Sequence, residues 1–144
     1  MPEVLVVDCS VAAKWVLPEP GDVEALRLLR EEQSGQVSLI APDLLLAEFA
    51  SLVARKVRRK QITSDQAREG FRFIKHSLPR LFETVPLLER ALDLALNNQM
   101  SLWDSVYLAL AIAENCSFLT ADRRLFRGHS PRHPAIRLLH MGNH

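Results

Sequence analysis

The chain has 144 residues, of which 48% are hydrophobic and 24% charged, an ordinary balance for a globular protein large enough to bury a core. Its formal net charge of +1 creates no overall field toward nucleic acid or membrane, so any such binding needs a local patch. The apolar runs are too short to span a membrane, and Cys9 and Cys116 have no metal-binding spacing. We therefore expect one domain over residues 1–144, a cytoplasmic protein with two buried thiols and no membrane association.

Strands and helices are predicted to alternate along the chain. In chain order we expect a strand at 4–7, a short helix capped by Ser10, a helix at 22–33, a strand at 37–40, a helix from Pro42 to about Lys60, a helix at 64–78 capped by Ser64 and stopped by Pro79, a weak strand at 83–85, helices at 87–98 and 102–114, a strand at 117–120, and a weak strand at 136–139. This order predicts an α/β fold, with helices covering both faces of a mostly parallel sheet.

Four acidic residues stand at unusual positions. Asp8 and Asp122 directly follow predicted strands. Asp104 lies in the first turn of an otherwise uncharged helix, between Leu102 and Ala113. Glu48 lies on an apolar helix face, because its neighbours three and four positions away are Leu44, Leu45, Ser51 and Leu52. An unpaired buried carboxylate is costly, so each of these positions needs a reason.

A metal site would explain all four acids together. Ligands bind to open parallel sheets at the carboxyl ends of the strands, where Asp8 and Asp122 fall. Carboxylates crowded into one crevice raise one another's pKa, and a hard divalent cation relieves that repulsion. Ligands that are oxygen alone, with no histidine or cysteine among them, favour Mg²⁺ or Mn²⁺.

Each acid also has a structural interpretation. Asp104 fits a capping box with Ser101. Asp8 could be a turn residue, Asp122 could cap a short helix at 123–127, and Glu48 could be a surface side chain. We prefer the metal site because one hypothesis then accounts for four separate observations.

Four segments carry a resemblance to a known family. They are VLVVDCSVAAKW, APDLLLAEFASLVAR, LWDSVYLALA and FLTADRRL, and they cover most of the chain in this order. Together they resemble a PIN-domain ribonuclease, specifically the VapC-type toxin of bacterial and archaeal toxin–antitoxin pairs. The resemblance implies a three-layer α/β/α sandwich and an endoribonuclease that depends on Mg²⁺, with Mn²⁺ as a substitute. It also implies growth inhibition through RNA cleavage, a homodimer, and a cognate antitoxin whose tail blocks the site with a basic side chain.

By position, the resemblance gives catalytic roles to Asp8, Glu48, Asp104 and Asp122. We expect Asp8 and Asp104 to be the principal metal ligands, with Glu48 and Asp122 holding metal-bound waters or a second ion. Ser10 would be a polar helper. The family pattern often has an aromatic residue before the third acid, and Trp103 fills that place.

Two basic groups are candidates for holding RNA. The run at the end of the predicted helix 42–60 is either a solvated helix end or a phosphate track: Arg55, Lys56, Arg58, Arg59 and Lys60. For Arg123, Arg124 and Arg127, which follow a proposed ligand, we favour phosphate contact. We expect Trp15 to pack in the core. The four histidines near the end of the chain are expected to belong to a loosely ordered end rather than a metal site: His129, His133, His140 and His144.

Other functions remain open at this point. A haloacid-dehalogenase-like phosphotransferase would use Asp8 as its nucleophile, but it would leave Glu48 on an apolar face unexplained. A PIN-like nuclease could serve housekeeping RNA processing instead of toxicity. A PIN-like module could also bind RNA or a partner without cleavage, although such a module would tolerate losing an acid and none is missing here.

Overall fold

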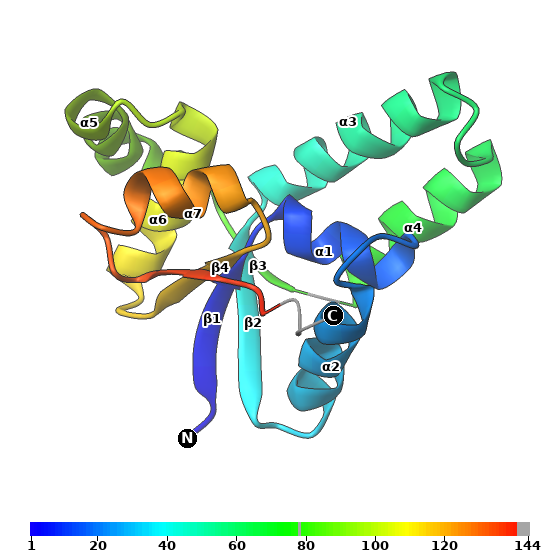
Figure 1. Ribbon diagram of the computed structural model, residues 1–144, viewed down its shortest axis with the longest axis horizontal. Coiled ribbons are helices and arrows are strands. Elements are labelled where there is room, and N and C mark those ends of the chain that lie inside the picture. The colour runs from blue at the N-terminus through cyan, green and yellow to red at the C-terminus, as the bar shows by residue number, and fades with distance from the viewer. Residues whose placement is uncertain (78, 141–144) are drawn as a thin grey trace.

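The computed structural model describes residues 1–77 and 79–140 and contains a five-stranded sheet (Figure 1). Its strands are β1 (Glu3–Val7), β2 (Val37–Pro42), β3 (Arg80–Phe82), β4 (Ser117–Thr120) and β5 (Ile136–Leu138). They lie in the order β3-β2-β1-β4-β5, and every neighbouring pair is parallel. Because β1 is central, the residue that follows it lies in the middle of the sheet's carboxyl edge.

Helices cover the sheet on both faces and confirm the predicted α/β architecture. They are α1 (Cys9–Val16), α2 (Asp22–Gln33), α3 (Leu44–Arg58), α4 (Ser64–His76), α5 (Leu88–Asn98), α6 (Leu102–Ala113) and α7 (Arg123–His129). Helix α6 packs across β1, β2 and β4 with α5 against it, and α1 and α2 lie on the other side of the sheet (Figure 1). Helices α3 and α4 form an antiparallel hairpin that extends away from the sheet. None of the described helices is both long and apolar enough to cross a membrane.

The apolar sequence around Asp104 is explained by the place of α6. Every residue from 105 to 111 is buried, because the helix lies between the sheet and α5. Tyr107 in this stretch stacks on Phe118 of β4, with ring centroids 5.6 Å apart. On the strand side, Val6 and Val7 of β1 are fully buried. The hydrophobic core therefore packs directly beneath the carboxyl ends of β1 and β4 and holds these strand ends in place.

The third strand lies three residues before its predicted position. The weak strand expected at 83–85 is wrong; β3 runs from Arg80 to Phe82 and pairs with β2 through Ile40. Residues Val85–Leu87 instead form a 3₁₀ turn that leads into α5. Pro86 explains the difference, since its fixed φ suits the first turn of a helix.

Two helix caps also differ from the prediction. Asp8, not Ser10, caps α1, because its carboxylate accepts the backbone N–H bonds at the helix start. Thr63, not Ser64, caps α4, in a capping box with Gln66. The first backbone N–H groups of a helix have no carbonyl partner within the helix. In both cases the residue just before the helix accepts hydrogen bonds from these groups, and a residue inside the first turn cannot reach them.

Two predicted helices are shortened by more than one residue at an end. The helix expected from Pro42 to about Lys60 is α3, Leu44–Arg58, and Pro42 instead ends β2. The helix expected to reach Leu78 ends at His76, and Leu78 itself lies outside the described residues.

Candidate functional site

Asp8 is the most deeply buried acid at the carboxyl edge of the sheet, with 7% of its surface exposed. Its Oδ1 accepts hydrogen bonds from Ser10 N at 3.0 Å, Ser10 Oγ at 2.5 Å and Val11 N at 3.3 Å. Its Oδ2 accepts one from Thr120 Oγ1 at 2.6 Å. Burial raises the pKa of Asp8 to about 6; the hydrogen bonds oppose this rise and the Asp104 charge adds to it.

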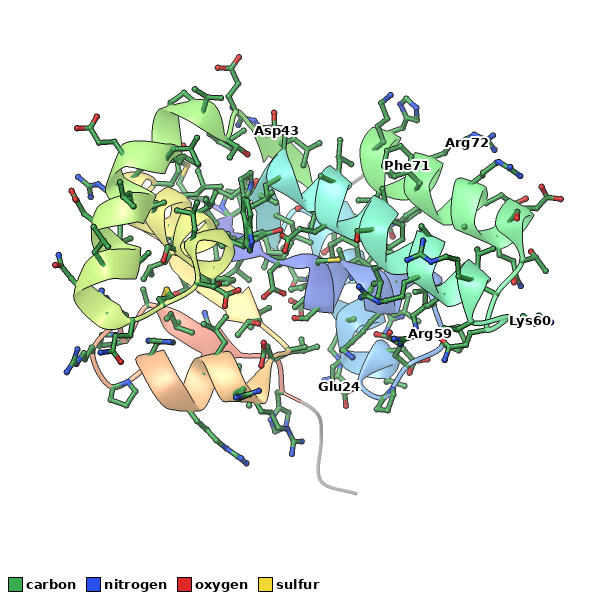
Figure 2. The ribbon with its side chains drawn as sticks, turned by 90° about the horizontal axis from the view of Figure 1, so that it is seen from above. Glu24, Asp43, Arg59, Lys60, Phe71 and Arg72 are labelled. Atoms are coloured by element: carbon green, nitrogen blue, oxygen red, sulfur yellow. The ribbon has the colours of Figure 1, made fainter. Side chains whose placement is uncertain are left out.

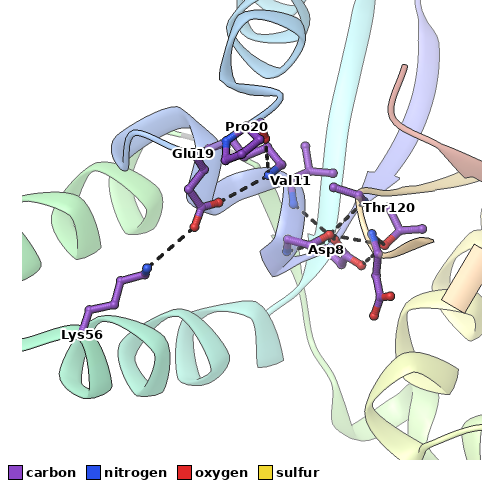
Figure 3. Close-up of polar contacts among 10 residues, drawn as sticks. Asp8, Val11, Glu19, Pro20, Lys56 and Thr120 are labelled. Carbon is purple, nitrogen blue, oxygen red and sulfur yellow. Dashed lines mark hydrogen bonds and ion pairs between the residues drawn. The ribbon is translucent and has the colours of Figure 1, made fainter. Parts of the chain in front are cut away.

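Two hydroxyls donate to that carboxylate, from Ser10 at the start of α1 and from Thr120 at the end of β4. Figure 3 shows Thr120 beside Asp8. Ser10 Oγ also accepts a hydrogen bond from Ala121 N at 2.9 Å, and Thr120 Oγ1 accepts one from Asp122 N at 3.1 Å. The two hydroxyl oxygens are 3.3 Å apart. Ser10 thus contacts the proposed ligand Asp8, and its role as a polar helper stays a prediction. Thr120 was not predicted as a site residue, although its position two residues before Asp122 at the end of a strand was a usable signal.

Asp104 lies half-buried in the first turn of α6. Its backbone N–H donates to Ser101 Oγ at 3.1 Å, which is one half of the capping box suggested by the sequence. The reciprocal bond, from Ser101 N–H to the Asp104 carboxylate, is absent from the described residues. Burial raises the pKa of Asp104; Ser101 and His129 lower it and the Asp122 charge raises it. The Asp104 carboxylate therefore does not accept the second hydrogen bond of a capping box.

Glu48 lies half-buried in α3 and has a partner that sequence reasoning missed. Tyr107 of α6 donates its hydroxyl hydrogen to Glu48 Oε1 at 2.5 Å. Burial raises the pKa of Glu48, the bond from Tyr107 opposes that rise, and the Asp104 charge adds to it. Burial and the proximity of Glu48 also raise the pKa of Tyr107, so this phenol stays protonated and donates. Its position among apolar residues made Tyr107 look like a core aromatic from the sequence.

Asp122 caps α7, as one of the two interpretations predicted. Its Oδ1 accepts hydrogen bonds from Arg124 N at 3.0 Å and Leu125 N at 3.2 Å. The side chain is exposed, and its charge still reaches Asp104. Capping and a place at the site are therefore compatible for this residue.

The electrostatic couplings identify Asp104 as the common neighbour of the other acids. Its charge raises the pKa of Asp8 and of Glu48, and Asp122 in turn raises the pKa of Asp104. The four carboxylates come from the ends of β1 and β4 and from α3 and α6, and Asp104 links the other three through these pairwise influences. Like charges at such a site disfavour full ionisation unless a cation is present.

The donor chemistry fits a hard divalent cation. The carboxylates and the Ser10 and Thr120 hydroxyls offer only oxygen, which suits Mg²⁺ or Mn²⁺. Within residues 1–77 and 79–140, no three histidine, cysteine, aspartate or glutamate side chains converge closely enough to enclose an ion by themselves. Mg²⁺ commonly uses one or two carboxylates and keeps several waters, so two aspartates completed by water is the arrangement these residues fit.

The basic run at the end of α3 is divided by the structure. Arg59 and Lys60 lie at the outer end of the α3–α4 hairpin (Figure 2). Lys56 faces inward, 4.0 Å from Glu19 Oε2 (Figure 3). Lys14 donates to Glu19 Oε1 at 3.4 Å and to a backbone carbonyl, so it ties down the loop between α1 and α2. Of this run, Arg55 lies in the same hollow as Glu48.

Arg123, Arg124 and Arg127 are exposed along α7, directly beyond Asp122. None of them forms an ion pair with another described residue. Their charges are therefore available to an external anion at the edge of the acidic site.

The remaining candidates have structural roles. Trp15 is buried as expected, and its Nε1 donates to Ala25 O at 2.9 Å. Cys9 and Cys116 are free and half-buried, a little more exposed than expected. His129 ends α7, and His133 bonds with Asn98 Oδ1 at 3.1 Å, so these two are not part of a loose end. His140 is exposed, and His144 lies outside the described residues.

Comparisons with known proteins agree on one family. The family model of the PIN domain matches residues 5–129. Ribonuclease VapC9 of Mycobacterium tuberculosis is 31% identical over 122 residues, which are 85% of this chain and 88% of that protein. The crystal structure of PAE2754 from Pyrobaculum aerophilum has the same fold, with a TM-score of 0.70 over 96% of this chain and 92% of that one, at 16% identity. A toxin–antitoxin complex from Klebsiella pneumoniae contains a chain that matches with a TM-score of 0.58 over 94% of this chain and 98% of that one, at 14% identity.

Proposed function

Since this chain belongs to the PIN-domain family, we propose that it is a metal-dependent endoribonuclease acting as the toxin of a toxin–antitoxin pair. The observation that carries the proposal is the placement of Asp8 and Asp122 at the carboxyl ends of β1 and β4 in a parallel sheet. Asp104 lies near enough for its charge to raise the pKa of Asp8 and of Glu48. The relative named a ribonuclease covers most of the chain, which supports RNA as the substrate. We propose that residues 1–144 act as a single domain in the cytoplasm.

Asp8 and Asp104 are the proposed principal holders of a Mg²⁺ or Mn²⁺ ion, and Glu48 and Asp122 would hold its waters or a second ion. When bound, such an ion supplies charge neutralisation for the phosphate and makes a water more acidic. The chain itself supplies the orientation. Ser10 and Thr120 fix both oxygens of Asp8, and Tyr107 holds Glu48.

The family match and Glu48 argue against the phosphotransferase alternative. The family model of the PIN domain covers residues 5–129. Glu48, which an aspartate nucleophile at Asp8 would leave unexplained, is half-buried and is held by Tyr107. These observations favour a ligand role for Asp8 over covalent catalysis.

Two protein partners belong to the proposal. An antitoxin is supported by the fold shared with a toxin–antitoxin complex, and a basic side chain from it would be attracted to the acidic site. A homodimer is supported by an exposed leucine stripe on α5, at Leu88, Leu92 and Leu96. A contiguous apolar surface of this kind is typical of protein contacts. A Leu92→Glu variant should shift the molar mass by light scattering from dimer to monomer.

The test of the proposed function uses purified protein without antitoxin. We expect cleavage of RNA in Mg²⁺ or Mn²⁺, no cleavage in excess chelator, and recovery when the metal is restored. In cells, expression of the chain alone should arrest growth, and Asp8→Ala should relieve the arrest while the protein still accumulates. Cleavage that continues undiminished in metal-stripped protein would refute the metal-dependent mechanism, and equal toxicity of folded Asp8→Ala would refute the link between site and arrest.

A further inference from the structure

A hollow of about 440 Å³ opens beside Glu48, between α3 and the start of α6. It is lined by Leu44, Ala47, Glu48, Ser51, Arg55 and Trp103. Its volume lies in the range of sites that hold small organic groups. Because Glu48 forms part of the wall, whatever occupies this hollow lies against the proposed cleavage centre.

Trp103 presents an exposed aromatic surface to the hollow, since 55% of its surface is accessible. The other tryptophan, Trp15, shows the contrasting case, because it is buried with its indole N–H satisfied. Leaving a large indole in water forgoes the stabilisation that burial would give, and tryptophan is enriched at binding interfaces. Neither the proposed metal site nor the core uses this side chain.

Arg55 provides a cation in the lining of the same hollow. It lies seven positions after Glu48 in α3, two turns along the same helix face. Unlike Lys56, it forms no ion pair within the described part of the chain.

We propose that this hollow binds one nucleotide of single-stranded RNA next to the cleaved phosphodiester, with its base stacked on Trp103 and its phosphate held by Arg55. This inference rests on the proposed ribonuclease function and extends it to a substrate subsite. The chemistry favours a nucleotide, because an aromatic plane and an unpaired cation match a base and its phosphate. A wall that includes Glu48 favours the substrate over a remote protein contact.

The stacking arm of the test replaces the indole by graded substitutions. A labelled single-stranded RNA oligonucleotide is titrated by anisotropy in excess chelator, so that binding is measured without cleavage. Loss of one base–aromatic stack lowers affinity roughly 5- to 150-fold, so Trp103→Ala and Trp103→Leu should both bind more weakly by that factor. Trp103→Phe should restore most of the affinity. Val23→Ala, which removes an exposed apolar side chain from α2, is the matched control and should bind as wild type does.

The phosphate arm uses two arginines of α3 and its cap. Arg55→Gln should weaken binding and reduce the salt slope of log affinity by about 0.7 units, as expected when one phosphate of single-stranded RNA is no longer neutralised. Arg59→Gln is the control, because Arg59 lies at the outer end of the hairpin (Figure 2). Thermal melts of all variants verify that they fold.

The outcomes separate this inference from the proposed function. Wild-type protein that cleaves RNA, together with Trp103→Ala that binds RNA equally well, overturns the subsite and leaves the ribonuclease standing. Unchanged RNA affinity with a loss of dimer or antitoxin binding in Trp103→Ala assigns the hollow to a protein contact and also overturns it. Wild-type protein that neither binds nor cleaves RNA refutes both proposals.

Discussion

The Tyr107 hydroxyl donates a hydrogen bond to Glu48 Oε1 across 59 positions of sequence, and so links α6 to α3 at the edge of the acidic site. Tyr107 is 1% exposed and stacks on Phe118, so its ring is held rigidly by the core. Glu48, which is half-buried on an otherwise apolar helix face, thus has a rigidly held hydrogen-bond partner in Tyr107. One carboxylate oxygen is engaged, which orients the group as a whole.

Removing that hydroxyl should affect cleavage more than folding. We expect Tyr107→Phe to keep the stack on Phe118, to change stability by about 1–3 kcal/mol at most, and to lower the cleavage rate at saturating metal roughly tenfold or more. The control is Phe118→Leu, which removes the stack and leaves the hydroxyl. That control should lower the melting temperature and retain most cleavage. Wild-type cleavage by Tyr107→Phe would show that Glu48 needs no positioning.

Asp8 should make the metal-free protein less stable as pH rises. Its folded-state pKa of about 6 lies above the value of 3.8 for the free side chain, so the folded state binds the proton more tightly. The stabilisation is fully present below pH 3.8 and is lost as pH rises through about 6. Relative to wild type, Asp8→Asn in chelator should gain on the order of 3 kcal/mol across that interval.

The measurement for Asp8 is denaturant unfolding of both proteins at several pH values. The Asn amide does not titrate, so the pH-dependent part of the difference reports the Asp8 carboxylate together with its hydrogen bonds. A constant difference between the two proteins from about pH 4 to about pH 7 would contradict the raised pKa.

Asp104→Asn separates a metal-site role from a capping role, because the two roles predict changes of opposite sign in the stability of the metal-free protein. As a member of a crowded carboxylate site, Asp104 suffers repulsion in metal-free protein, so the variant should be equally or more stable in chelator. Added Mg²⁺ should stabilise the variant less than wild type, because the stabilisation increases with the affinity of the folded protein for the ion. RNA cleavage should collapse. Melting curves with and without Mg²⁺ measure this, and a less stable variant with an intact Mg²⁺ response and intact cleavage would make Asp104 a capping residue only.

The arginines of α7 should hold RNA through its phosphates. Replacing Arg123, Arg124 and Arg127 by Gln should weaken RNA binding and flatten its dependence on salt, by about 0.7 units of slope for each phosphate of single-stranded RNA that these arginines neutralise. An equal charge removal at the outer end of α3, with Arg58, Arg59 and Lys60 changed to Gln, is the comparison. Equal salt slopes for the α7 variant and wild type would return these arginines to a solvated surface.

The sequence alone determined which strands and helices follow one another along the chain, and it determined the family. Short β-branched runs and amphipathic periods are local properties, and they placed α2 and β4 at their observed limits. The four odd acids were also visible, because a charge inside an apolar pattern is costly unless something compensates it. Predictions failed where local signals competed, as at β3, whose position depends on pairing with β2 rather than on its own residues.

Only the tertiary structure decided which groups meet. Thr120 and Tyr107 carry no strong signal of function in the sequence, because a threonine in a strand and a tyrosine in an apolar helix are ordinary core residues. Their hydroxyls gain a role through hydrogen bonds across 112 and 59 positions, with Asp8 and Glu48 respectively. Such bonds depend on the register of the sheet and the packing of α6 on it. The same packing places Asp104 where its charge interacts with those of Asp8, Glu48 and Asp122, and this repulsion makes a cation favourable.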